Sequence, residues 1–80
     1  MKVHFHFKVT CNWDDEARVW YVAESNVPGL SAEAPTVEAM NQLLSVRIPE
    51  LVELNMRDFD PDNACFELVT RQHLRFAAVA

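Results

Sequence analysis

Basic and histidine side chains alternate with apolar side chains near both ends of this 80-residue chain. The basic and histidine positions are Lys2, His4, His6, Lys8, Arg71, His73 and Arg75. Imidazoles two residues apart on a strand can share a metal ion, and clustered cations can bind nucleic-acid phosphates or an acidic protein surface. The pattern therefore allows a metal site, an RNA-binding face or a protein contact, and it also fits a sheet face that is only solvated.

Charge separates these alternatives. Lys2 and Lys8 flank the two early imidazoles, and their positive charges oppose a metal held by His4, His6 and perhaps His73. The formal net charge of −5 argues against non-specific binding to a phosphate backbone, although a local patch could still hold RNA. We expect no metal and no cofactor. Among the functional interpretations, contact with a protein, either a second copy or a docked partner, fits the residues best.

Catalytic patterns are weak in this sequence. Asp14, Asp15 and Glu16 are adjacent in a polar stretch, where a solvated hairpin end explains them better than carboxylates converging on a pocket. No Ser or Cys stands in a nucleophile motif, and the single Gly cannot form a phosphate-cradling loop. We therefore predict that the protein is not an enzyme.

Length and composition predict one globular domain over residues 1–80. Half of the residues are apolar, yet no run approaches the roughly 20 apolar residues of a membrane span, and the N-terminus lacks a signal-peptide pattern. These features predict a cytoplasmic protein without membrane contact. Cys11 and Cys65 are expected at opposite ends of neighbouring strands, as free thiols.

The first half of the chain has the patterns of three strands. The alternation over residues 2–12 is nearly complete and predicts a strand with one buried face. Residues 13–16 predict a hairpin loop. Residues 17–25 predict a second strand whose alternation is too weak to show which face is buried. Trp20 can therefore be a core residue or the centre of an interface, and we include it among the candidate partner-binding residues. Residues 30–34 predict a short third strand.

A turn and a helix start separate this half from the rest. Pro28 and Gly29 have the residue types of a type II turn, and Thr36 is the predicted N-cap of a helix that reaches Asn55. Apolar residues recur along this helix at three-and-four spacing, which predicts that it lies on the sheet. Pro49 lacks the N–H that would bond the Ser45 carbonyl, so a kink or a break is expected there.

Residues 56–63 predict a loop. Residues 64–78 predict a last strand, which places on one face Glu67, Arg71, His73 and Arg75. The element order is β-β-β-α-β. A right-handed crossover through the helix then brings the last strand beside the first, parallel to it. The predicted fold class is α+β, a two-layer sandwich with a mixed sheet and one main helix packed on one face.

The motif around the turn resembles the HicB-like antitoxin family, the N-terminal domain of bacterial HicB proteins and related short chains. The matching residues are Val27-Pro28-Gly29 after an aromatic-rich strand and Thr36-Val37-Glu38-Ala39 at the helix start. The chain departs from the family pattern in Leu30, where Cys is frequent, and in a hairpin without Gly. By motif the resemblance covers roughly residues 1–55, and by element order it covers the whole chain.

The resemblance implies a partial ribonuclease-H-like fold, no catalysis, and association with a small HicA-like toxin that cleaves mRNA. We expect a homodimer or higher oligomer that binds such a toxin through the basic sheet face. Many family members append a DNA-binding domain, and we expect none of its own in this chain, since nothing after Arg75 could encode one. An orphan RNA-binding or regulatory oligomerisation module using the same face is the alternative.

Overall fold

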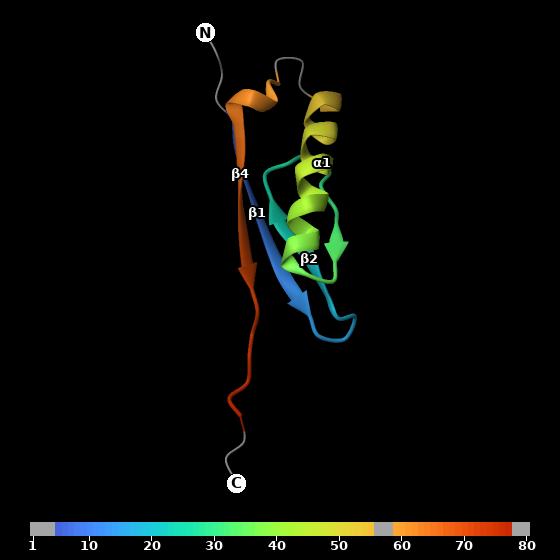
Figure 1. Ribbon diagram of the computed structural model, residues 1–80, viewed down its shortest axis with the longest axis vertical. Coiled ribbons are helices and arrows are strands. Elements are labelled where there is room, and N and C mark those ends of the chain that lie inside the picture. The colour runs from blue at the N-terminus through green and yellow to red at the C-terminus, as the bar shows by residue number, and fades with distance from the viewer. Residues whose placement is uncertain (1–4, 56–58, 78–80) are drawn as a thin grey trace.

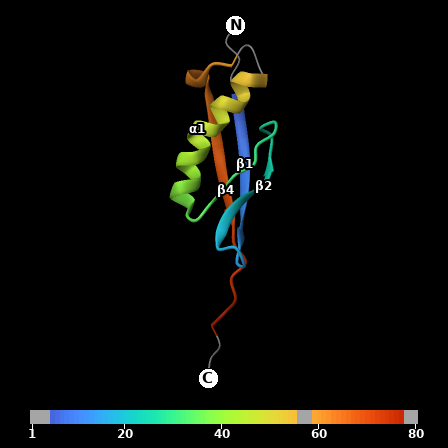
Figure 2. The same cartoon turned by 90° about the vertical axis from the view of Figure 1, so that its right-hand side faces the viewer.

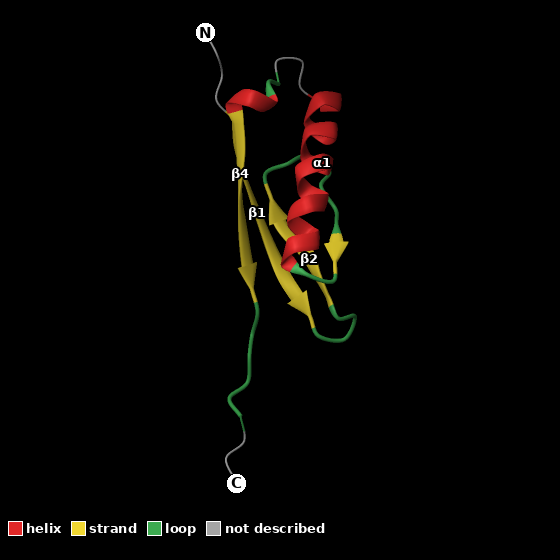
Figure 3. Cartoon of the chain, viewed as in Figure 1, coloured by secondary structure: helices red, strands yellow, loops and turns green. Residues whose placement is uncertain are grey.

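A computed structural model describes residues 5–55 and 59–77 as one helix packed on a four-stranded mixed sheet (Figure 1). The α+β class and the β-β-β-α-β order predicted from sequence are confirmed. Figure 3 separates the helical and strand segments by colour. The elements are β1 (Phe5–Asp14), β2 (Val19–Ser25), β3 (Glu33–Ala34), α1 (Val37–Asn55), the single 3-10 turn η1 (Pro61–Asn63) and β4 (Ala64–Arg71).

The sheet has the strand order β3-β2-β1-β4. β2 pairs antiparallel with both β1 and β3, whereas β4 pairs parallel with β1, as predicted. A parallel pair needs a long crossover, and α1 provides it by running back across one face of the sheet (Figures 1 and 2). The opposite face carries no helix of the described residues.

The core lies between α1 and the sheet. Phe7, Val9 and Cys11 are buried at alternate positions of β1, because successive strand side chains point to opposite faces. The residues of α1 that meet them are three or four apart, as expected for one helix face: Met40, Leu44, Ile48 and Val52. This contact fixes which face of the sheet is covered.

The chain reverses at Pro28-Gly29 and enters the helix at Thr36, as predicted. The Leu30 N–H donates to the Val27 carbonyl at 3.3 Å, and Gly29 has a φ of 73°, which suits the third position of a type II turn. The Thr36 hydroxyl accepts from the Ala39 N–H at 3.0 Å and so caps the first turn of α1.

β2 presents Trp20 and Val22 to the core, which answers the question that its sequence left open. The register of β1 and β2 shifts between Thr10 and Cys11, so Ala23 is the extra residue of a bulge. A bulge interrupts the alternation, and this is why periodicity was uninformative. Trp20 therefore does not lie on the exposed sheet face, and its prediction as a partner-binding residue of that face is wrong.

Of the two alternatives predicted at Pro49, a kink or a break, the break is ruled out, because α1 continues through this residue. Loss of one backbone hydrogen bond and the clash of the ring cost a helix about 3 kcal/mol. Ile48 and Val52, on either side of Pro49, are both buried in the core, and their packing holds the two halves of the helix on one sheet.

Three strand boundaries also differ from the predictions. β1 extends through Asp14 because Trp13 pairs with Trp20, with ring centroids 5.3 Å apart, and the hairpin turn follows. β2 accordingly begins at Val19, and β3 shrinks to two residues because only Glu33 and Ala34 pair with β2.

β4 ends at Arg71, not at residue 78. Arg71 is level with Asn12, and β1 turns into the hairpin only two residues later, so the segment 72–77 has no neighbouring strand. This segment runs away from the body of the domain (Figure 1) and is exposed throughout. We call it the arm.

Candidate partner-binding surface

The sheet face opposite α1 is open, and we call it the outer face. Its side chains come from the strand positions that alternate with the buried ones. In the described residues they include His6, Lys8, Thr10, Asn12, Tyr21, Glu24, Cys65, Glu67, Val69 and Arg71. The parallel register of β1 and β4 places Lys8 beside Glu67 and Asn12 beside Arg71.

A shallow depression of about 350 Å³ lies on this face. Lys8, Glu24 and Arg71 line its rim together with Thr10, which is 5% exposed. The two cations thus share the depression with a carboxylate, and Glu67 stands beside Lys8. The predicted basic face is therefore mixed in charge. Such a surface can pair with both carboxylates and cations of a protein partner.

His6 lies between a thiol and a carboxylate on the same face. Its Nδ1 is 3.7 Å from Cys65 Sγ, and its Nε2 is 4.0 Å from Glu67 Oε1. Both His6 and Glu67 are more than half exposed, so the ion pair contributes little to stability even when the imidazole is charged. The three groups are aligned on an open surface.

The structure separates the other predicted residues. Lys2 and His4 lie outside the described residues. His73 and Arg75 belong to the arm and line a hollow with Trp13 and Asp15, so their predicted place in a strand paired with β1 is wrong. His6 is level with Cys65, eight residues before His73, a span of roughly 26 Å along an extended chain. His6 and His73 cannot share one ion. Residues 5–55 and 59–77 hold no group of three potential ligands.

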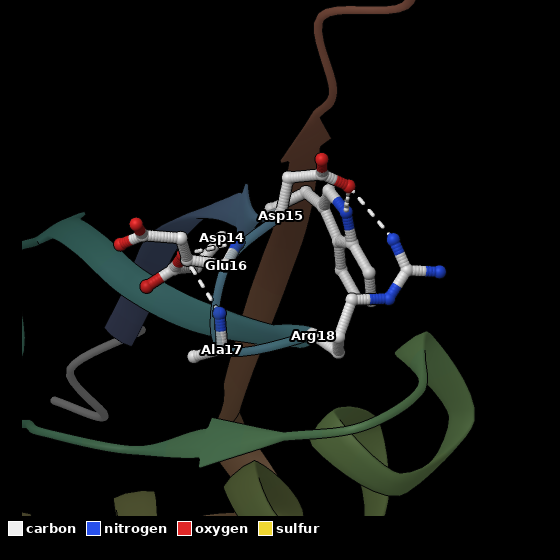
Figure 4. Close-up of polar contacts among 6 residues, drawn as sticks. Asp14, Asp15, Glu16, Ala17 and Arg18 are labelled. Carbon is white, nitrogen blue, oxygen red and sulfur yellow. Dashed lines mark hydrogen bonds and ion pairs between the residues drawn. The ribbon is translucent and has the colours of Figure 1, made fainter.

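The acidic hairpin uses its carboxylates to build its own turn (Figure 4). Asp14 Oδ1 accepts from the N–H groups of Glu16 and Ala17 at 3.0 and 3.1 Å. Arg18 Nη1 lies 2.7 Å from Asp15 Oδ1, and its guanidinium stacks 5.3 Å from the centroid of the Trp13 ring. Arg18 has a φ of 60°, a conformation that glycine usually supplies. The predicted solvated hairpin end is confirmed.

A second feature, an apolar pocket, lies at the sheet edge and was not predicted from the sequence. A pocket of about 240 Å³ opens between the start of β4 and the second half of α1. Its walls include Phe7, Ile48, Phe59 and Phe66. Phe59 packs edge-on against Phe7 with centroids 6.3 Å apart. Phe59 is an aromatic residue within a polar stretch, and that isolation was the one sequence signal for this pocket.

The cysteines differ in accessibility. Cys11 is buried on the core face, and burial raises the pKa of its thiol above the ordinary value of 9.0. Cys65 is exposed on the outer face. Both are free, as predicted.

The fold and surface define a small α+β domain with a helix on one side of its sheet and an open, polar face on the other. Residues 6–78 match the family described as "Domain of unknown function (DUF1902)", and the chain belongs to this family. It is similar to the crystal structure of a hypothetical protein, TTHA1013, from the extremely thermophilic bacterium Thermus thermophilus. The identity is 36% and the TM-score 0.66, over 91% of this chain and 99% of the other.

No curated protein matches the chain. No helix among the described residues combines the length and the apolar character that a bilayer crossing requires.

Proposed function

We propose that this protein is a non-catalytic, HicB-like antitoxin-type domain of the cytoplasm that forms a homodimer or higher oligomer. In this proposal it binds a small HicA-like toxin that cleaves mRNA and blocks the toxin's active site. The observation that carries the proposal is the open outer face, where Lys8, Glu24 and Arg71 converge on one depression while the other sheet face is filled by α1.

The local geometry of the family motif supports this assignment. The turn at Pro28-Gly29 and the cap at Thr36 have the conformations for which their residue types are suited. β4 returns parallel to β1, which is consistent with a partial ribonuclease-H-like sheet. These features link the aromatic-rich strand, the turn and the helix start in the order that the resemblance implies.

The composition of the outer face favours a protein over RNA. Glu67 stands beside Lys8, and Glu24 shares the depression with both cations, so phosphates would meet carboxylates as well as positive charge. A folded protein can place its own cation opposite each carboxylate and a carboxylate opposite each cation. Tyr21, 38% exposed on the same face, adds an aromatic side chain of the kind that interface centres contain.

Expression together with a toxin-sized protein encoded next to this gene tests the proposal. The two proteins should purify as a complex, and this chain should restore growth that the toxin arrests. The double variant Lys8→Glu, Arg71→Glu should weaken the complex by about tenfold or more, since both changes replace an attraction by a repulsion. Arg47→Glu is the matched control, because Arg47 is an exposed cation on α1.

A complex that loses affinity only with the outer-face variant supports the proposal. Absence of both a complex and growth rescue overturns it. Retention of RNA at low salt by the wild-type chain, abolished by the outer-face variant, would instead establish the RNA-binding alternative.

A further inference from the structure

β4 is an edge strand with an unpaired side. The sheet order places β1 on one side of β4, and no described strand lies on the other. Eight residues of exposed edge present unpaired N–H and C=O groups, which are a template for another strand. The arm follows β4 as a loop segment that leads away from the domain (Figures 1 and 3), so the edge would reach residue 77 once the arm took up strand conformation.

The arm carries two apolar side chains that the monomer leaves in solvent. Leu74 is 77% exposed and Phe76 is fully exposed. Both have even numbers, as do Phe66 and Leu68, which face the core from β4. If the arm keeps the strand alternation of β4, Leu74 and Phe76 lie on the helix side of the sheet and Arg75 on the outer side.

The apolar pocket is complementary to this arrangement. It lies on the helix side near the start of β4, and Ala64, Phe66, Ile48 and Phe59 are among its walls. A strand that pairs antiparallel with β4 and ends near Ala64 would bring its last apolar residue to this pocket. An aromatic ring is suited to such a site, because a phenylalanine buries about 150–250 Å².

We propose that two copies of this chain pair antiparallel through residues 64–77, with the arm of each lying along β4 of the other and Phe76 entering the partner copy's apolar pocket. The pairing joins two four-stranded sheets across a two-fold axis and covers the β4 edge of each copy. It gives a mode of assembly to the homodimer of the proposed function, and it does not depend on toxin binding.

One pairing register brings compatible side chains together on both the helix side and the outer side of the joined sheet. With Arg71 at the two-fold axis, Phe76 of one copy is opposite Phe66 of the other, so that apolar side chains meet on the helix side. On the outer side Arg75 is opposite Glu67, an attractive pair. The two Arg71 side chains meet at the axis and oppose pairing slightly, since both are exposed to solvent.

This register predicts a specific cross-link. Residue 77 of one copy is opposite Cys65 of the other copy, and Cys65 is an exposed free thiol. Opposite residues of an antiparallel pair have Cα atoms about 4.5–5.5 Å apart, which is within the range of a disulfide. Ala77→Cys should therefore form a disulfide-linked dimer under mild oxidation. The wild-type chain and the double variant Ala77→Cys, Cys65→Ala should not, and Arg75→Cys tests the neighbouring register.

Loss of the aromatic side chain tests the pocket. Phe76→Asp should weaken dimerisation by about a hundredfold or more in sedimentation equilibrium, because each dimer loses two buried rings. Phe76 is exposed in the monomer, so folding should be unaffected. Leu54→Asp on α1, where Leu54 is 82% exposed, is the control and should leave the dimer intact.

A dimer that cross-links through Ala77→Cys and dissociates with Phe76→Asp supports the proposal. A wild-type chain that is monomeric at 100 µM, roughly the concentration of such measurements, overturns it. A dimer that survives Phe76→Asp or fails to cross-link overturns it as well. None of these measurements needs a toxin, so their outcome is separate from that of the antitoxin proposal.

Discussion

Replacement of Pro49 by alanine should stabilise the protein, although Pro49 lines the apolar pocket. Pro49 lies inside an unbroken helix, where proline is about 3 kcal/mol less favourable than alanine. Two effects oppose this gain. The unfolded chain becomes more flexible, at a cost of about 0.4–1 kcal/mol, and the half-buried ring loses contacts equivalent to about one methylene, or 0.8 kcal/mol. Pro49→Ala should therefore raise the free energy of unfolding by about 1–2 kcal/mol.

Urea denaturation and thermal unfolding measure this effect. For a domain of this size, the expected gain corresponds to a rise in Tm of about 5–15 °C. Glu53→Ala, a change at an exposed position of the same helix, should stay within about 0.5 kcal/mol of the wild type. If Pro49→Ala lowers the free energy of unfolding, the packing of the proline ring stabilises the protein by more than proline destabilises the helix. That result refutes the reasoning on α1.

Four further predictions concern the cap, the hairpin and the thiols. Thr36→Ala should lower the free energy of unfolding by about 1 kcal/mol in urea denaturation, and Thr36→Ser should not, because the hydroxyl accepts from the Ala39 N–H. Arg18→Gly should be less destabilising than Arg18→Ala by about 1 kcal/mol, since both lose the side chain and only glycine relieves the positive φ. An aromatic disulfide reagent should label Cys65 in the folded protein and Cys11 only after unfolding. Burial raises the pKa of the Cys11 thiol in the folded state. The free energy of unfolding should therefore keep its full value below pH 9.0, the ordinary thiol pKa, and decline as the pH rises through the folded-state pKa. Cys11→Ala should reduce this decline.

The fold was predictable wherever one periodicity acts alone. Phe7, Val9 and Cys11 alternate without interruption, and the buried residues of α1 keep a single helical spacing. The turn at Pro28-Gly29 was predictable because proline and glycine restrict or extend the backbone directly. Element order then determined the parallel return of β4, since an intervening helix allows that connection.

Predictions failed where tertiary contacts decide the outcome. The bulge at Ala23 depends on how β1 and β2 pair, so the orientation of Trp20 could not be read from its own strand. The helix survives Pro49 because of core contacts that lie outside its local sequence.

Tertiary contacts also decide which residues belong to the candidate partner-binding surface, as the end of β4 shows. Residues 72–77 keep a strand-like alternation, but β1 no longer accompanies them, so His73 and Arg75 leave the predicted basic face. The sequence assigned Glu67 to the same face as Arg71, yet only the register revealed that it stands beside Lys8. Charge on a sheet face depends on which strands pair and where they stop.

The most direct test of the partner-binding account is the affinity of this chain for a toxin-sized protein encoded beside its gene, measured by isothermal titration calorimetry with wild-type and Lys8→Glu, Arg71→Glu protein. The account predicts saturable binding by the wild type, a dissociation constant at least about tenfold weaker for the double variant, and no change for Arg47→Glu. Equal binding by all three proteins, or no binding by the wild type, would contradict it.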